Sequence, residues 1–129
     1  MKEAVVLRCG TDLVNIASFQ RRVERSRNDF LGRYWTERER QNVGVRMESF
    51  AARWAAKEAV MKALGVGIGR LDPTDIEIVT RGLEPAVHLH RNAAREAKRL
   101  SLTQWAVSLT HEGGWAMAFV VALGGNQVD

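Results

Sequence analysis

The chain has 129 residues, of which 46% are hydrophobic and 26% are charged; this composition excludes a disordered or collagen-like chain. Its one cysteine, Cys9, excludes an intramolecular disulfide framework and fits a reducing compartment. The longest apolar run, residues 115–123, has nine residues, whereas a membrane-spanning helix needs about 20. No signal-peptide pattern is present. We therefore expect residues 1–129 to form one soluble, cytoplasmic domain.

The net charge of +4 is concentrated in one segment, because residues 18–46 contain eight Arg and only four acidic residues. An Arg-rich face indicates an anionic partner such as nucleic acid, phosphate or an acidic protein. A solvated, salt-bridged surface explains the same counts equally well. Charge alone leaves both interpretations open.

The first half of the chain predicts short elements. Residues 4–9 predict a strand that ends at Gly10, and residues 14–24 predict a helix. Thr36 followed by Glu39 matches a capping box, which indicates that another short helix begins there.

The strongest prediction is a long helix over residues 47–64. Gly65 follows it, at the position where left-handed backbone geometry commonly ends a helix. With Gly67 and Gly69, it predicts a flexible turn or a loop in which a ligand approaches the backbone closely.

The second half predicts strands around one helix. Residues 75–80 and 86–90 alternate in polarity and predict a hairpin, residues 91–100 predict a helix, and residues 105–110 and 115–123 predict two further strands. This order predicts an α+β fold, with a mostly antiparallel sheet packed against helices that include one long central helix.

Glu58 lies within an apolar stripe of the long helix. Because this helix is apolar on most sides, a carboxylate inside it requires a partner. Lys62 follows one turn later and forms a favourable Glu–Lys spacing, which predicts an ordinary ion pair. The alternative is a carboxylate that holds a cation, with Lys62 beside it for an anionic ligand. The helix alone leaves both open.

Asp12 and His111 are two further polar candidates. Asp12 follows the first strand, where an aspartate commonly caps the next helix; the alternative is a metal ligand at the strand edge. His111 ends a strand, where it either orients a ligand or belongs to the turn. The three His and one Cys show no zinc spacing, and the glycine loop matches no nucleotide fingerprint.

Four segments together carry a resemblance to a known family. They are GTDLV at 10–14, FAARWAAKEAVMKALGVGIG at 50–69, DIEI at 75–78 and SLTH at 108–111. In order and spacing the chain resembles, nearly end to end, the holo-acyl-carrier-protein synthases, small bacterial members of the 4′-phosphopantetheinyl transferase superfamily. The central WAAKEAVMKALG stretch is the most specific part.

The resemblance implies an Mg²⁺-dependent reaction. Such enzymes transfer the 4′-phosphopantetheine group of coenzyme A to a serine of an apo acyl carrier protein and release adenosine 3′,5′-bisphosphate. By motif position Asp12 and Glu58 would be metal ligands, and Lys62 would be a catalytic residue that contacts phosphate. Further candidates for binding coenzyme A are Arg53, Lys57, Gly65, Gly67 and His111.

The resemblance also implies an acidic carrier protein that docks on a basic first helix, where Arg21, Arg22 and Arg25 lie in or just beyond the matching segment. The chain departs from the family at two positions, since Ser18 stands where a basic residue is usual and Asn15 where an acid is common. The docking pose therefore stays open, as does the choice between fatty-acid biosynthesis and a specialised pathway.

A homotrimer with active sites at subunit interfaces is a further implication of the resemblance. Trp54, Met61, Trp115 and Phe119 would support it if they face outward. The alternative function is a non-enzymatic, Arg-rich nucleic-acid or nucleotide-binding module, but the aromatic residues do not alternate with Arg as in RNA-binding proteins. A third hypothesis is an inactive relative that still binds coenzyme A.

Overall fold

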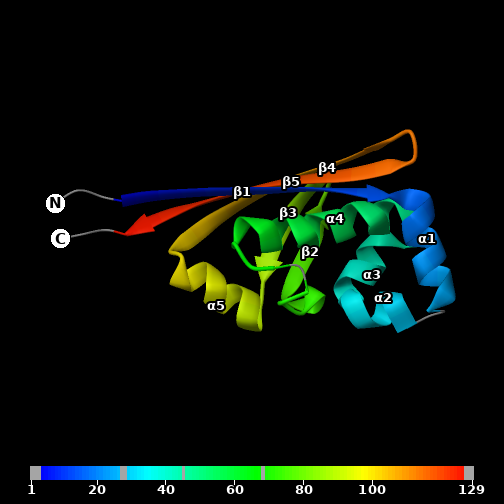
Figure 1. Cartoon of the computed structure of the whole chain (residues 1–129), viewed down its shortest axis with the longest axis horizontal. Coiled ribbons are helices and arrows are strands. Elements are labelled where there is room, and N and C mark those ends of the chain that lie inside the picture. The colour runs from blue at the N-terminus through cyan, green and yellow to red at the C-terminus, as the bar shows by residue number, and fades with distance from the viewer. Residues whose placement is uncertain (1–3, 27–28, 45, 68, 127–129) are drawn as a thin grey trace.

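Two long strands that are far apart in the sequence pair with each other in the main sheet. The computed structural model describes residues 4–26, 29–44, 46–67 and 69–126. Strand β1 (Ala4–Asn15) pairs along its whole length with β5 (Trp115–Asn126), which also pairs with β4 (Leu102–Glu112). This antiparallel sheet has the order β1-β5-β4, and the helices cover one of its two faces (Figure 1).

The sheet has two faces of opposite character, because successive side chains of a strand point to opposite sides. Even-numbered residues face the helices over 6–14 of β1 and 116–124 of β5: Gly10 lies opposite Val120, and Asp12 lies opposite Ala118. Alanines and valines of β5 on this face are buried, so the helices pack closely against it. The same alternation places Gly10 and Asp12 on the helical side.

Helix α4 (Met47–Ala63) packs against this face and is buried along most of its length, as its apolar sequence predicts. It ends with a Schellman motif: Val66 donates its N–H to the carbonyl of Met61, and Gly65 donates to that of Lys62. Gly65 has φ +74°, which a residue with a side chain rarely adopts.

Three short helices gather at one end of the sheet (Figure 1): α1 (Ile16–Arg25), α2 (Asp29–Tyr34) and α3 (Glu37–Val43). The capping box predicted for α3 is confirmed, because Glu39 N–H donates to Thr36 Oγ1 and Thr36 N–H donates to Glu39 Oε1. Helix α2 was not predicted. Its Phe30 packs against aromatic rings of the neighbouring helices, so tertiary packing stabilises it.

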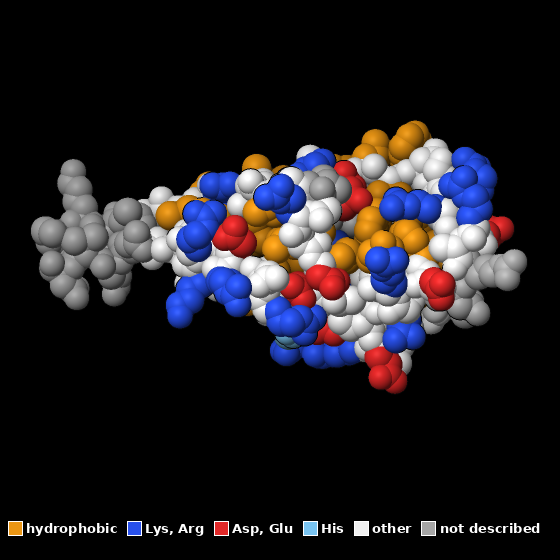
Figure 2. Space-filling view, turned by 60° about the horizontal axis from the view of Figure 1, so that its bottom comes forward, with side chains coloured by type: hydrophobic (Ala, Val, Ile, Leu, Met, Phe, Trp, Pro, Cys, Tyr) orange, Lys and Arg blue, Asp and Glu red, His pale blue; other side chains and the backbone are white. Residues whose placement is uncertain are grey.

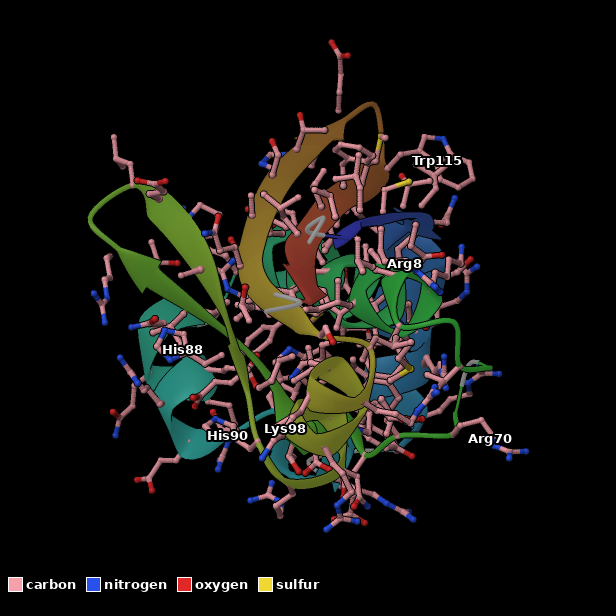
Figure 3. The ribbon with its side chains drawn as sticks, turned by 90° about the vertical axis from the view of Figure 1, so that its left-hand side faces the viewer. Arg8, Arg70, His88, His90, Lys98 and Trp115 are labelled. Atoms are coloured by element: carbon pink, nitrogen blue, oxygen red, sulfur yellow. The ribbon has the colours of Figure 1, made fainter. Side chains whose placement is uncertain are left out.

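A second, two-stranded sheet completes the fold. A short 3₁₀ turn, η1 (Pro73–Asp75), leads into β2 (Ile76–Arg81), which pairs with β3 (Glu84–Leu89) as an antiparallel hairpin; α5 (Arg91–Arg99) then leads to β4. Figure 3 shows His88 and His90 on the side of this hairpin, away from Arg8 on β1. The predicted α+β class with antiparallel pairing is confirmed.

The face of the large sheet that carries no helices exposes large apolar side chains. Trp115 projects from this outer side in Figure 3 and is 45% exposed. The residues that share this exposure are Val5, Leu7, Leu13, Trp115, Met117, Phe119 and Leu123. Trp54 and Met61 are buried, so of the four residues considered for a subunit interface only Trp115 and Phe119 face outward. Within the described residues, no helix is long and apolar enough to span a membrane.

The prediction that the first strand ends at Gly10 was wrong. Strand β1 continues to Asn15 because it pairs residue by residue with β5. Asn15, and not Asp12, caps α1: its Oδ1 accepts a hydrogen bond from Ser18 N–H at 2.9 Å. Asp12 is therefore a strand residue that is free for another role.

Candidate active site

Asp12 of β1 and Glu58 of α4 border one cavity on the helical side of the sheet. The cavity has a volume of about 250 Å³ and is lined by both polar and aromatic side chains. Its lining residues are Asp12, Leu13, Val14, Asn15, Ser18, Phe19, Arg22, Trp54 and Glu58. Two acidic residues 46 positions apart in the sequence thus meet because β1 runs across α4.

The two carboxyl groups interact directly. The pKa of Glu58 is raised to about 7, first by burial and then by a hydrogen bond with Asp12 and by repulsion from its charge. Lys62 and Arg22 oppose this shift but do not cancel it. Close to pH 7, Glu58 is therefore only partly ionised, and a bound cation would replace its proton and balance the charge of both carboxylates.

Lys62 lies beside the acidic pair. Its Nζ is 3.1 Å from Asp12 Oδ1 and donates to the carbonyl of Thr11 at 2.9 Å. The side chain is 46% exposed, so the ammonium group is accessible to a ligand. The spacing on the helix had indicated an ion pair of Lys62 with Glu58 as one interpretation. In the structure Lys62 instead forms its ion pair with Asp12 of β1.

Arg22 joins the site from α1. Its guanidinium lies 5.0 Å from the ring centre of Phe30 and 5.6 Å from that of Trp54, so aromatic faces hold it at the cavity. Ser18 lines the same cavity and Asn15 caps the helix, which gives both departures from the family pattern a structural role.

Arg21 and Arg25 lie on the outer surface of α1. Figure 2 shows Lys and Arg side chains over much of the visible face, including the end of the molecule at which α1 lies. Arg21 and Arg25 border a shallow cavity of about 280 Å³ with Glu24. Arg22 thus lines the cavity of the acidic pair, and Arg21 and Arg25 extend the basic surface along α1.

Lys57, the residue before Glu58, does not reach the cavity. It is fully buried, and its Nζ donates to Glu39 Oε1 at 2.8 Å and to the carbonyls of Pro73 and Ile76. Burial lowers the pKa of Lys57, and Glu39 opposes that shift. The expectation that Lys57 contacts coenzyme A is therefore corrected: its three donor positions are used inside the protein.

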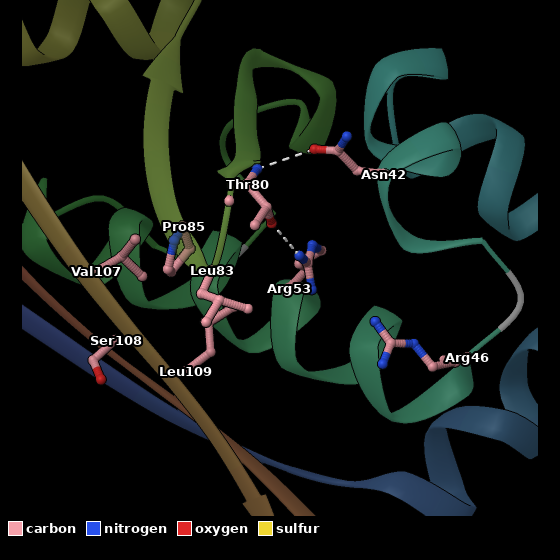
Figure 4. A pocket seen from close by; sticks show the side chains of 10 residues that line it. Asn42, Arg46, Arg53, Thr80, Leu83, Pro85, Val107, Ser108 and Leu109 are labelled. Atoms are coloured by element: carbon pink, nitrogen blue, oxygen red, sulfur yellow. Dashed lines mark hydrogen bonds between the residues drawn. The ribbon is translucent and has the colours of Figure 1, made fainter.

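Arg53 lines a second, larger cavity of about 580 Å³ between α4, the β2–β3 hairpin and β4 (Figure 4). Its Nη2 donates to Thr80 Oγ1 at 2.6 Å, and Asn42 Oδ1 accepts from Thr80 N–H. Arg53 Nε is buried and has no hydrogen-bond partner in the described part of the chain. Arg46 lines this cavity too, which makes it cationic.

The remaining predicted residues lie apart from the acidic pair. Gly65 and Gly67 follow α4, and Arg8 on β1 fastens this end by donating from Nε to the carbonyl of Ala63 at 2.9 Å. His111 is exposed at the end of β4, two residues beyond Leu109, which lines the Arg53 cavity.

Trp54 and Phe19 border the acidic cavity and were not predicted as site residues. An aromatic residue at helical spacing reads as core, and both are indeed buried. Trp54 lies one turn before Glu58 on α4, and this spacing was the one signal available for it.

Comparisons with known proteins identify the family of this chain. The family described as the 4′-phosphopantetheinyl transferase superfamily matches residues 8–120. A holo-[acyl-carrier-protein] synthase of Herpetosiphon aurantiacus is 39% identical over 123 residues, which cover 89% of this chain and 97% of the relative. One of Desulforudis audaxviator is 41% identical over 124 residues, with 93% and 95% covered.

A solved structure supports the same assignment. The crystal structure of Helicobacter pylori holo-[acyl-carrier-protein] synthase in complex with coenzyme A is similar with a TM-score of 0.80 and 32% identity, covering 88% of this chain and 98% of that one. Sequence and fold therefore place this chain in the 4′-phosphopantetheinyl transferase superfamily, among the holo-[acyl-carrier-protein] synthases.

Proposed function

We propose that this enzyme moves 4′-phosphopantetheine from coenzyme A to a serine of an apo acyl carrier protein at the cavity of Asp12 and Glu58. The serine oxygen forms a bond to the phosphorus that carries pantetheine, the bond from that phosphorus to adenosine 3′,5′-bisphosphate breaks, and the hydroxyl proton is released. The observation that carries the proposal is the convergence of Asp12, Glu58 and Lys62 in a chain of this family.

The donor set fits Mg²⁺. Asp12 and Glu58 offer carboxylate oxygens, the ligand type that Mg²⁺ prefers, and their mutual repulsion leaves charge that a cation would balance. Within the described ranges no cluster of three or more His, Cys, Asp or Glu side chains is placed to hold a metal. Two carboxylates suffice for Mg²⁺, which commonly keeps water and substrate phosphate as its other ligands. When bound, it would neutralise charge on the pyrophosphate and on the departing bisphosphate.

The chain's own residues position the substrates. Lys62 offers an accessible ammonium group to phosphate beside the carboxylates, and Arg22 holds a guanidinium at the same cavity. Because phosphoryl transfer depends chiefly on positioning and charge stabilisation, these groups form a sufficient set. Arg21 and Arg25 extend the positive charge along α1, where an acidic carrier protein would dock.

We further propose a homotrimer in which a neighbouring subunit completes each site. The apolar outer face of the sheet provides a surface to bury between subunits. The cavity of Arg53 lies at the β4 edge of the sheet, whereas Asp12 lies on β1 at the opposite edge. Arg53 Nε has unused hydrogen-bonding capacity, which favours an anionic ligand in this cavity. We assign this cavity to the adenosine bisphosphate half of coenzyme A bound at the adjacent subunit, with His111 near it. The exposed thiol of Cys9 fits a cytoplasmic enzyme.

The direct test incubates the chain with coenzyme A, Mg²⁺ and a panel of apo carrier proteins, and measures intact mass. A gain equal to one phosphopantetheine group, lost when Mg²⁺ is chelated, is the expected result. No gain on any apo carrier protein would contradict the proposed function, and the carrier protein that reacts fastest identifies the pathway.

A further inference from the structure

Gly10 lies against the backbone of α4 with no room for a side chain. A Cβ atom built at this residue would lie 1.9 Å from the carbonyl oxygen of Ala59 and 3.0 Å from the nitrogen of Ala63. Ordinary van der Waals contact begins at 3.4 Å. Strand β1 and helix α4 therefore approach each other at this point only because the residue on the strand is glycine.

This close approach lies next to both carboxylates of the candidate active site. Gly10 precedes Asp12 by two residues and shares its face of β1, and Ala59 directly follows Glu58 on α4. The separation of strand and helix at Gly10 therefore sets the distance between the backbone positions of Asp12 and Glu58.

We propose that Gly10 is a positioning residue for the metal site: its missing side chain sets the strand–helix spacing that lets Asp12 and Glu58 bind one divalent cation. This inference depends on the proposed function, because it assumes a cation between these two residues. Relief of the contact that a methyl group would make requires a displacement of about 1.5 Å. Mg²⁺ tolerates little change in ligand distances near 2.0–2.1 Å, and a misplacement of about 1 Å at a reacting centre costs ~10²-fold in rate.

Gly124 provides a matched control. A Cβ atom there would lie 1.8 Å from the carbonyl oxygen of Ser101, a collision as severe as the one at Gly10. Gly124 pairs with Val6 of β1, six residues before Asp12 and so roughly 20 Å away along the strand. Gly124→Ala therefore strains the packing of this sheet without moving the acidic pair.

The experiment measures binding of Mn²⁺ alone, by electron paramagnetic resonance, to the wild type, Gly10→Ala, Gly124→Ala and Asp12→Asn. Circular dichroism verifies that each protein is folded. We expect Gly10→Ala to weaken Mn²⁺ affinity at least tenfold and to lower kcat about 10²-fold. Gly124→Ala should remain within about twofold of the wild type in affinity even if its thermal midpoint falls. Equal affinities for the two alanine variants would overturn the proposal.

A rescue variant separates spacing from general damage. Asp12→Glu adds one methylene group, which extends the carboxylate toward Glu58. In the wild-type background this longer side chain should weaken Mn²⁺ binding, whereas in the Gly10→Ala background it should recover part of the lost affinity. A loss of the same size in both backgrounds would contradict the spacing role.

These measurements distinguish failure of the inference from failure of the proposed function. If Asp12→Asn binds Mn²⁺ as well as the wild type, the metal site itself is wrong. If Asp12→Asn loses binding and folded Gly10→Ala keeps it, only the role of Gly10 fails. If Gly10→Ala stays unfolded even in trimethylamine N-oxide, which favours compact states, while Gly124→Ala folds, then Gly10 serves folding alone and the proposal is overturned.

Discussion

Lys57 and Glu58 are neighbours on α4, but their side chains occupy opposite environments. Lys57 is fully buried against Glu39, whereas Glu58 borders the cavity that it shares with Asp12. Consecutive side chains of a helix diverge by about 100°, so a single pair of residues serves two functions. Lys57 fastens α4 to α3 and β2, and this anchoring fixes the rotation at which Glu58 faces β1.

The acidic pair predicts a severe loss of activity when either charge is removed. Asp12→Asn and Glu58→Gln should each lower the transfer rate by at least about 10²-fold, because each removes part of the charge that would hold the cation. Steady-state assays with a reactive carrier protein measure this, with Glu37→Gln on the exposed side of α3 as control. Near-normal turnover by either folded variant would refute the assignment.

The raised pKa of Glu58 predicts that metal binding weakens in acid. Without metal this carboxyl titrates at about 7, and a cation must displace its proton. The affinity for Mn²⁺ should therefore rise with pH and level off above about 8, with a loss of about tenfold at pH 6. Titrations at pH 6, 7 and 8 measure the change. Glu58→Gln should bind weakly with a flat profile in this range; a flat profile for the wild type would contradict the prediction.

The buried ion pair of Lys57 with Glu39 predicts a large effect on stability. Glu39→Gln leaves a buried ammonium group without its anion and should lower the free energy of unfolding by about 3–5 kcal/mol. Urea denaturation measures this change. Glu96→Gln, which breaks the exposed pair with Arg99, should change it by less than about 0.5 kcal/mol. Equal effects of the two substitutions would show that burial does not determine how much an ion pair contributes to the free energy of unfolding.

The basic surface of α1 predicts a selective effect on the carrier protein. Replacing Arg21 and Arg25 by Ala should raise KM for the carrier protein by roughly 3–10-fold and make it less sensitive to salt, with kcat and the KM for coenzyme A unchanged. Kinetics at two ionic strengths test this. Arg95→Ala on α5 is the control, and an equal effect there would indicate only general charge attraction.

An active site that combines Asp12 of one subunit with the Arg53 cavity of its neighbour predicts complementation between inactive subunits. Asp12→Asn and Arg53→Ala should each be poorly active alone. After the two proteins are unfolded together and refolded, about a quarter of the subunit interfaces should combine an intact Asp12 with an intact Arg53. Recovered activity supports a site shared between subunits. If the mixture is no more active than its components, each subunit carries its own complete site.

Local sequence signals predicted much of the fold, including the capping box of α3 and the burial of α4. They failed where tertiary pairing overrides local preference. Gly10 reads as the end of a strand, but pairing with Val120 carries β1 past it. Helix α2 is too short to show periodicity and is held by Phe30.

Part of the site could not be predicted from local sequence patterns, because tertiary contacts join residues that are distant in the sequence. Lys57 is the neighbour of Glu58 in the sequence, and the family resemblance suggested that it binds coenzyme A. No local pattern shows that Glu39 of another helix pairs with Lys57 in the interior. The convergence of Asp12 and Glu58 came from the family resemblance, since nothing local joins residues 46 positions apart. Their contact with a metal and with substrate stays a prediction.

The pairing of β1 with β5 has a consequence for synthesis in the cell. Asp12 leaves the ribosome about 100 residues before Trp115, the first residue of the strand that pairs with β1. A nascent chain without β5 therefore contains both acidic residues but lacks the partner strand of β1. We expect the candidate active site to form only after β5 has been translated and has paired with β1. Such distant strand pairing also slows folding, because a long loop must close before its contacts form.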